Sequence, residues 1–294
     1  MKANFLLKGI AMTAILFLTS CSKDNATDSN VLTADDANAT SKMDQATNAI
    51  STITEDQVAR TFIDPSTGKG LEPNPNILPC ATITINPQPS VQNPIQPGTT
   101  VTKTIDFGTG CDITNKIHVS GKIIISFLFN PGDANHTATI TFDHFTHNGK
   151  TIDGTKSITK TIGTSDNLAT PHPIFTSEEN LSVTFKNGKT YTRVGTKTRE
   201  CIAGFQTASV LDNVYLETGS HITTRPNGKT FTATITTPLR IEVSCLSGIV
   251  SGVVTIAGPE HTLVIDYGDG TCDALATRTI DGGTPVQFDF TSDN

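Results

Sequence analysis

Three Asn-Gly pairs constrain the fold of this 294-residue chain more than any other feature, because each predicts a tight reversal between two strands. Asn-Gly is the strongest short-range signal for a β-hairpin, since both residues tolerate the positive φ that a tight turn requires. The pairs are Asn148-Gly149, Asn187-Gly188 and Asn227-Gly228. We therefore expect three hairpins with Asn and Gly at the two central turn positions, each followed by a solvent-facing Lys.

Alternating apolar residues predict strands on both sides of these turns. Ile123, Ile125, Phe127 and Phe129 would share one face of a strand. No strong helical period appears after about residue 100, so the crossover helices of a parallel sheet are missing. Residues 99–294 are therefore expected to form one all-β domain, built as an antiparallel sandwich or as a curled, barrel-like sheet.

The residues before this domain differ in character. Residues 22–40 are polar, and with Cys21 they are expected to form a flexible tether over 21–40. Apolar residues from Met43 to Val58 recur at helical spacing, which predicts a short helix over 41–62 with Ser41 as its N-cap. Residues 63–98 are rich in proline and predict an irregular link with one strand, Ala81 to Ile85.

The first twenty residues are interpreted as a signal peptide. Lys2 and Lys8 are followed by a ten-residue apolar run, Gly9 to Leu18. This run is too short for a helix that spans a bilayer, which needs about 20 apolar residues. The sequence Leu18-Thr19-Ser20-Cys21 resembles the lipobox of bacterial lipoproteins. That resemblance implies cleavage before Cys21 and acylation of Cys21, by palmitate or a similar chain. An ordinary secretory signal, with Cys21 incidental, is the alternative.

The residues after Cys21 carry two further resemblances. Ser22, where an Asp would retain a lipoprotein in the inner membrane, is similar to the residue found in lipoproteins of the outer membrane. Ser22-Lys23-Asp24 resembles the polar export tags of surface lipoproteins in the Bacteroidota. Loss of residues 1–20 changes the formal charge from −7 to −9, so neither nucleic acid nor an anionic surface is an expected partner. The expected partner is the lipid bilayer, reached through the acylated cysteine.

An internal repeat relates the two ends of the β domain. Ile105-Asp106-Phe107-Gly108-Thr109-Gly110-Cys111-Asp112 matches the stretch from Ile265 to Asp273, which reads Ile-Asp-Tyr-Gly-Asp-Gly-Thr-Cys-Asp. The match continues to Gly121 and Gly282 and then to pairs of Phe, and each unit also has an earlier cysteine. We expect two related terminal β units. In an exported chain this spacing suggests the disulfides Cys80–Cys111 and Cys245–Cys272, which leave Cys201 over.

Residues 75–294 as a whole resemble flavobacterial-type outer-membrane lipoproteins. The lipobox, the Asp-aromatic-Gly units, the Gly-Thr-Lys turns at Gly154 and Gly195 and the stretch from Thr237 to Arg240 carry this resemblance. That family has no assigned activity, so the resemblance implies location and fold and no function.

Motifs for catalysis and metal binding are weak. Gly-Lys-Thr begins at Gly149, Gly188 and Gly228, but the glycine that a P-loop requires five residues earlier is missing each time. The sequence has no Cys-x-x-Cys pair, which is the spacing typical of a zinc site. Asp266, Asp269 and Asp273 form a candidate Ca²⁺ loop, although turn aspartates more often bond nearby backbone N–H groups. No metal site and no cofactor are therefore assigned.

The remaining ionisable residues have ordinary settings. Glu178 and Glu179 would diverge on a strand, and they are interpreted as part of a solvated loop. Glu200 could activate the Cys201 thiol only with a His or a cation nearby, and the favoured interpretation is that Cys201 is a small buried hydrophobic residue.

The expected function is an outer-membrane lipoprotein with a noncatalytic structural, adhesive or partner-binding β domain. The alternative is a Ca²⁺-dependent, glycan-binding or hydrolytic module of a nutrient-uptake system at the cell surface. The near absence of Trp and Tyr lowers the glycan hypothesis, since sugars commonly stack on these rings.

Overall fold

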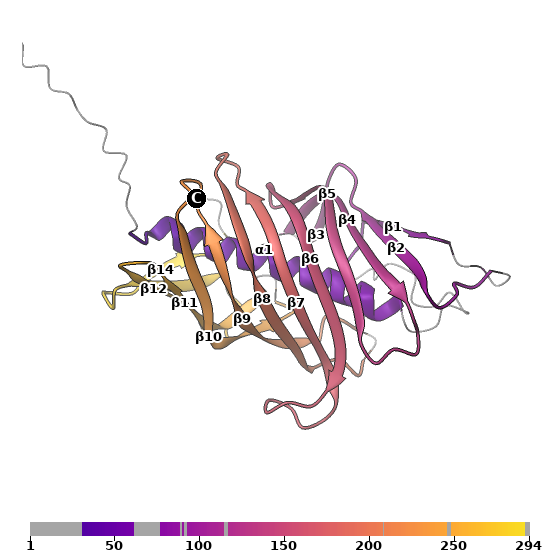
Figure 1. Ribbon diagram of the computed structural model, residues 1–294. Helices are drawn as coiled ribbons and strands as arrows, with labels where there is room; N and C mark the ends of the chain where they lie inside the picture. Colours follow the sequence, from indigo (N-terminus) through magenta and orange to yellow (C-terminus); the bar gives the residue numbers. More distant parts are fainter. Residues whose placement is uncertain are drawn as a thin grey trace, which may run out of the picture.

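The computed structural model describes residues 31–61, 77–88, 90, 93–114, 117–207, 209–245 and 248–291. These residues form one helix and a single antiparallel sheet of fourteen strands (Figure 1). The elements are α1 Ala34–Thr61, β1 Thr82–Asn86, β2 Thr99–Asp106, β3 Cys111–Thr114, β4 Ile117–Phe129, β5 His136–His147, β6 Lys150–Gly163, β7 His172–Thr184, β8 Thr190–Ala203, β9 Val214–Thr224, β10 Thr230–Glu242, β11 Ile249–Ala257, β12 Thr262–Asp269, β13 Leu275–Ile280 and β14 Val286–Asp289. The predicted signal peptide, Cys21 and most of the segment predicted to be a tether lie outside the described residues.

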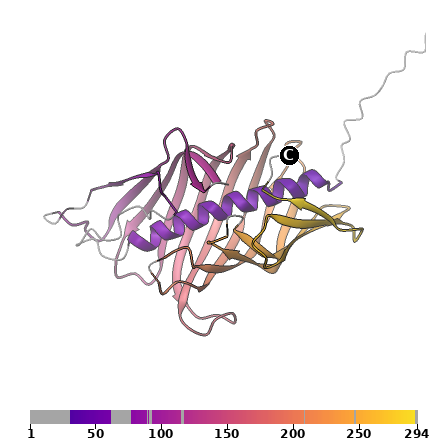
Figure 2. The same ribbon diagram turned by 180° about the vertical axis from the view of Figure 1, so that it is seen from behind.

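The strands follow one another across the sheet in chain order, except that β3 pairs with β4 beside the main path. β1 and β14 are the two ends of this path, so the sheet is not closed into a barrel, and Figures 1 and 2 show that it curls around α1. The prediction of an all-β antiparallel domain is confirmed, and its curled-sheet alternative describes the architecture.

The helix α1 lies along the concave side of the sheet, which we call the trough. Figure 2 shows the helix with the first strands on one side of it and the last strands on the other. Over residues 34–58 almost every side of α1 is buried, and the more exposed positions lie along one side of the helix. These positions are Ala34, Asp35, Asn38, Ala49 and Asp56. Within the described residues, no helix is both long and apolar enough to cross a membrane.

The helix begins seven residues before the predicted start at Ser41, within the segment predicted to be tether. Thr33 is its N-cap, because the Asp36 carboxylate accepts hydrogen bonds from the Thr33 backbone N–H at 2.8 Å and from its hydroxyl at 3.0 Å. Asp35 and Asp36 in the first turn also complement the helix dipole. Ser41 instead donates to the Ala37 carbonyl inside the helix at 2.6 Å. The prediction of a helix here is confirmed, but its start is wrong.

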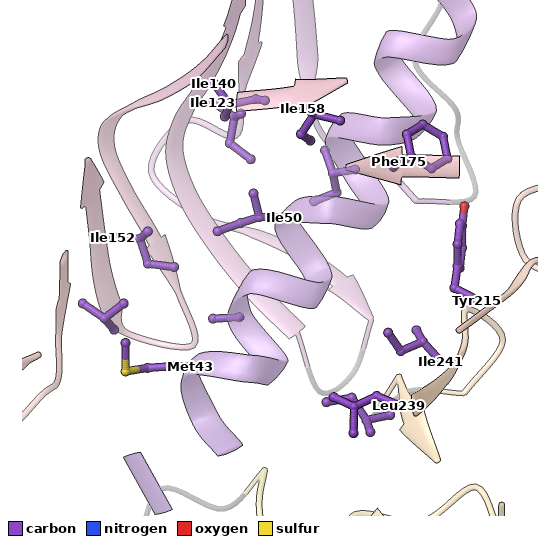
Figure 3. Packing of buried hydrophobic residues seen from close by; sticks show 14 of the residues in the cluster. Met43, Ile50, Ile123, Ile140, Ile152, Ile158, Phe175, Tyr215, Leu239 and Ile241 are labelled. Carbon is purple, nitrogen blue, oxygen red and sulfur yellow. The ribbon is translucent and has the colours of Figure 1, made fainter. Parts of the chain in front are cut away.

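Apolar side chains from α1 and the sheet form a continuous core (Figure 3). Met43 and Ile50 of the helix are fully buried, as is Ile123 on β4. The alternating residues of β4 all point into the trough, as the sequence predicts. Burying such side chains contributes about 1.5–3 kcal/mol each and fixes the strand register, since a slip of one residue would expose the whole set.

Glycines in the middle of strands allow the sheet to bend around the helix. Gly154 lies in β6 with φ +110°, and a Cβ there would collide with the Asn180 carbonyl oxygen. Gly219 in β9, with φ +136°, meets the Thr196 carbonyl oxygen in the same way. The prediction that the Gly-Thr-Lys stretches at Gly154 and Gly195 are turns is therefore wrong, because both lie inside strands.

The three Asn-Gly pairs do join antiparallel neighbours, but only one forms the predicted turn. Asn148 and Gly149 both have positive φ, at 50° and 71°. In the other two hairpins only the glycine does, and each loop has three residues and a bulge, with Gly188 N–H donating to Phe185 O at 2.9 Å. All three Gly-Lys-Thr stretches thus lie at hairpins, not at a helix N-terminus.

The lysines after these turns differ from the prediction in one case. Lys150 is only 2 % exposed and lies inside the trough, so the expectation that it faces solvent is wrong. Lys189 is exposed, as predicted, and its ammonium lies 3.6 Å from the Asp35 carboxylate.

The related terminal units and both predicted disulfides are present. We call residues 80–129 the N-terminal unit and residues 245–290 the C-terminal unit. Cys80 is bonded to Cys111 and Cys245 to Cys272, with Cα separations of 5.8 and 5.6 Å. Cys201 is free and buried. The correspondence ends after the second cysteine, because β2 pairs directly with β4, whereas β13 separates β12 from β14.

Candidate functional site

The centre of the trough holds a cluster of charged side chains that is buried between α1 and the sheet. We call it the interior ion-pair network. Every member is at most 4 % exposed. Its members are Asp44 and Glu55 of α1, Lys156 of β6, Glu179 of β7, Arg193, Lys197 and Arg199 of β8, and Glu217 of β9. Charges buried to this degree require partners, and the helix supplies part of them.

Strand β8 brings three cations to the same face. Arg193, Lys197 and Arg199 occupy alternate positions of the strand, with Gly195 between the first two, so all point into the trough. The residues on the opposite face include Thr192, Thr196 and Thr198, which are exposed or half-buried. The strand therefore turns its cations inward and these threonines toward solvent.

Asp44 is the acceptor through which the first half of α1 is held. Its Oδ1 accepts a hydrogen bond from Arg193 Nη1 at 2.6 Å and lies 3.8 Å from Lys197 Nζ. Its Oδ2 accepts a hydrogen bond from the Tyr267 hydroxyl at 3.1 Å. Arg193 also donates to the Thr40 carbonyl at 3.3 Å. One helical carboxylate thus joins β8 to β12, two strands that are far apart in the sheet.

Arg199 joins the second half of α1 to the sheet. Its guanidinium lies 3.1 Å from Glu55 and 3.6 Å from Glu217, and it stacks 4.3 Å above the centre of the Tyr215 ring. It also donates to the Asn48 side-chain oxygen at 3.2 Å. A planar guanidinium can pair with carboxylates and stack on an aromatic ring at once, which a lysine ammonium cannot do equally well.

Two lysines complete the network. Lys156 donates to the Glu179 carboxylate at 2.8 Å and to the Ser51 hydroxyl of α1 at 2.6 Å. Lys197 donates to the Glu217 carboxylate at 2.8 Å. Each sheet carboxylate is therefore paired with a cation, whether or not the helix is considered.

The carboxylates of the network have different proton affinities. Burial raises the pKa of Glu55 to about 7, because the desolvation outweighs the attraction of Arg199 and Lys156. Burial would also raise the pKa of Glu179, but Lys156 and Lys197 hold it at about 2. Glu217 has a lowered pKa because Lys197 and Arg199 outweigh its desolvation. Of these three carboxyls, Glu55 is the one whose pKa is raised by its surroundings.

This chemistry suits the holding of a helix. The charged atoms contact one another or α1, and they are shielded from solvent by both layers.

Burial raises the pKa of the Cys201 thiol to about 12, so this buried cysteine is not an activated nucleophile. Across the described part of the chain, no three His, Cys, Asp or Glu side chains come together in a way that could hold a metal ion.

The candidate Ca²⁺ loop has the geometry of ordinary turn aspartates. The Oδ1 atoms of Asp266, Asp269 and Asp273 accept backbone N–H groups two residues further on, at 2.9, 3.1 and 2.9 Å. These local bonds are the alternative that the sequence favours. Hydrogen bonds from Thr271 lower the pKa of Asp269, which keeps that carboxylate ionised and engaged within the turn.

The other residues singled out from the sequence are separated. Glu178 is exposed on the convex face and Glu179 is buried in the trough, so they diverge as predicted. The expectation of a loop there is wrong, because both lie in β7. Glu200 accepts hydrogen bonds from Ser165 and Asn167 at 2.6 and 3.0 Å, on the opposite face of β8 from Cys201.

The sequence does not identify the interior ion-pair network. Alternation on β8 could indicate that its cations share a face, but a charged face is normally assigned to solvent. Only the position of α1 shows that this face is covered.

Comparisons with protein-family models, with curated proteins and with solved structures return no match to this chain.

Proposed function

We propose that this chain is a bacterial lipoprotein, held in the outer membrane by an acylated Cys21, with a noncatalytic β domain that acts as a structural, adhesive or partner-binding module. The lipobox-like sequence Leu18-Thr19-Ser20-Cys21, preceded by an apolar run too short to span a bilayer, supports the anchor. The charge of −9 after residue 20 supports attachment by lipid, since an acidic chain is repelled by anionic surfaces.

The distance from anchor to domain is short. The dozen or so residues between Cys21 and the N-cap Thr33 span at most roughly 40 Å when fully extended. In the part of the chain that the structure describes, α1 is the first element after Cys21. The lipid would therefore hold the domain near the membrane through the helix that fills the trough.

The filling of the trough by α1 is the observation that carries the noncatalytic assignment. The ionisable residues of the interior ion-pair network face α1 and already form ion pairs, such as Arg193–Asp44 and Arg199–Glu55. A catalytic group must reach its substrate, and these groups are covered. This arrangement supports a role in which the domain binds or supports a partner.

Replacement of Cys21 by Ala tests the anchor. We expect the wild-type chain to incorporate labelled fatty acid and to fractionate with outer membranes, whereas Cys21→Ala loses both properties. Ser22→Ala is the matched control, because it changes the neighbouring residue and keeps the acylated cysteine. Continued fractionation of Cys21→Ala with outer membranes, together with an unlabelled wild type, would refute the proposal.

A further inference from the structure

A largely apolar pocket lies beside α1. Its wall is formed by residues between 77 and 117 and by residues between 211 and 248. Its free volume is about 90 Å³, partly open to solvent, which is room for several water-sized groups. Aliphatic side chains make most of its wall. These are Ile77, Ile113, Ile117, Leu211, Ile241 and Val243.

One side of α1 contributes the polar groups of this pocket. Gln45, Asn48 and Thr52 lie three to four residues apart and so share a helix face. Arg199 donates to the side-chain oxygens of Asn48 and Thr52, at 3.2 and 3.5 Å. These two residues are therefore already engaged with the interior ion-pair network.

Gln45 differs from its two neighbours. It is 2 % exposed, and within the described part of the chain neither its Nε2 nor its Oε1 has a hydrogen-bond partner. Buried amides are nearly always paired, because leaving a donor and an acceptor unsatisfied is costly. An unpaired carboxamide at the wall of an apolar pocket indicates that a ligand supplies the missing partner.

The wall also restricts the charge of that ligand. Among the described residues that line the pocket, none carries a formal charge. A charged group placed there would lose its hydration without gaining an ion pair. A neutral group that offers one donor and one acceptor side by side matches the Gln45 carboxamide, and an amide has this pattern.

We propose that this pocket binds a small neutral molecule with an aliphatic body and a single amide group. The ligand carbonyl would accept a hydrogen bond from Gln45 Nε2, and the ligand N–H would donate to Gln45 Oε1. The inference rests on the proposed binding role of the domain. It does not depend on the anchor, so failure of the Cys21 experiment would leave it standing, and its own failure would leave the anchor standing.

The absence of tryptophan from the sequence makes a sensitive test available. Leu211→Trp places a single fluorophore at the pocket mouth, where Leu211 is 38 % exposed. Ile162→Trp, at a position outside the pocket lining and 58 % exposed, reports nonspecific effects of the probe. The full-length chain in detergent is titrated with hexanamide, with 2-heptanone, which has the same shape but no N–H donor, and with the hexanoate anion.

We expect hexanamide to change the Leu211→Trp fluorescence saturably and to leave Ile162→Trp unchanged. Affinity should fall in the order hexanamide, 2-heptanone, hexanoate. Adding Gln45→Met, which keeps the side-chain length, should weaken hexanamide about tenfold and 2-heptanone by less, because the ketone loses only the hydrogen bond from Gln45 Nε2. No saturable response to hexanamide, or equal affinity for hexanamide and 2-heptanone, would overturn the proposal without relying on the Gln45 variant. An affinity for hexanamide that is the same with and without Gln45→Met would overturn the role of the carboxamide.

Discussion

The N-terminal and C-terminal units are built on the same local motif but hold the helix by different means. In both, an aspartate side chain accepts a hydrogen bond from the backbone N–H two residues on, which is an Asx turn: Asp106 at the end of β2 from Gly108 at 2.8 Å, and Asp266 inside β12 from Gly268 at 2.9 Å. In both, a disulfide closes the unit. The shared residues therefore specify the same turn at opposite ends of the sheet.

The two units differ in the aromatic residue that follows this aspartate, which is Phe107 in one and Tyr267 in the other. Phe107 is buried in apolar surroundings, 5.9 Å from the Phe145 ring. Tyr267 packs edge-on against Phe290 at 5.2 Å and donates its hydroxyl to Asp44 of α1. At the N-terminal unit it is Lys103 that contacts the helix, through the Gln57 carbonyl at 2.9 Å. The Tyr267 hydroxyl, which Phe107 lacks, thus connects the C-terminal unit to the interior ion-pair network.

The largest effect is expected from removal of either disulfide. Cys80→Ala with Cys111→Ala, or Cys245→Ala with Cys272→Ala, should each lower the free energy of unfolding by roughly 3–4 kcal/mol in the chain-entropy model. The two losses should agree closely, because the sequence separations of 31 and 27 are similar. Denaturant unfolding of both variants measures the losses. A much larger loss at one end would mean that the units are not energetically equivalent.

A smaller, pH-dependent effect should separate the two ends. His147, which pairs with Val119 of the N-terminal unit, is fully buried, and burial lowers its pKa to about 3. Its neutral form is the stable one when folded, so its contribution is complete above the ordinary value of 6.5 and is lost as the pH falls toward 3. At pH 4.5 we expect this residue to cost about 2–3 kcal/mol relative to pH 7.

Unfolding of His147→Gln and wild type at both pH values measures that cost, since other groups cancel in the difference. The stability of the variant should depend less on pH by the stated amount. His261→Gln, at a less buried histidine within the C-terminal unit, is the matched control. Identical pH profiles for wild type and His147→Gln would contradict the prediction.

Exchanging the two aromatic residues tests the comparison directly. Tyr267→Phe removes one hydrogen bond to the Asp44 carboxylate and should cost about 1.5 kcal/mol. Phe107→Tyr brings a hydroxyl into an apolar site and should cost about 1–3 kcal/mol. Combining Tyr267→Phe with Asp44→Asn in a double-mutant cycle isolates the hydroxyl–carboxylate interaction. If Phe107→Tyr were stabilising, the surroundings of the two rings would be more alike than their contacts indicate.

The smallest effect should come from the shared turn. Asp106→Ala and Asp266→Ala each remove one exposed hydrogen bond to a backbone N–H and should cost about 0.5–1.5 kcal/mol. Equal losses by thermal unfolding would support the equivalence of the turns. Asp106 also lies 3.8 Å from the Lys122 ammonium, so a loss that depends on salt is expected only at the N-terminal turn.

The local features of the fold are accessible from the sequence, and the trough is not. Alternation locates β4, Asn-Gly locates the hairpins, and repeated spacing gives both disulfides, because each signal acts over a few residues or is duplicated. The bend of the sheet depends on glycines such as Gly154 and Gly219 inside strands, and these are indistinguishable from turn glycines until the strands are paired.

The interior ion-pair network escapes prediction for a related reason. A strand that presents Arg193, Lys197 and Arg199 on one face satisfies the pattern of a solvent-facing strand. Its burial depends on a distant helix, whose Asp44 precedes Arg193 by 149 residues, and that helix is itself polar. The N-cap is a local signal, but Thr33 and Asp36 have the same spacing as Ser41 and Asp44, and the pattern alone does not decide between them.

The order of synthesis gives the polarity of α1 a further meaning. Each strand pairs with one made shortly before it, so the sheet can assemble hairpin by hairpin as the chain emerges. The helix is made before all of them, yet Tyr267, which binds Asp44, follows 223 residues later. An apolar helix would spend that interval exposed to aggregation. A helix rich in Asp, Asn, Gln, Ser and Thr remains hydrated until the last strands have been made, and its docking into the trough can be the last step of folding.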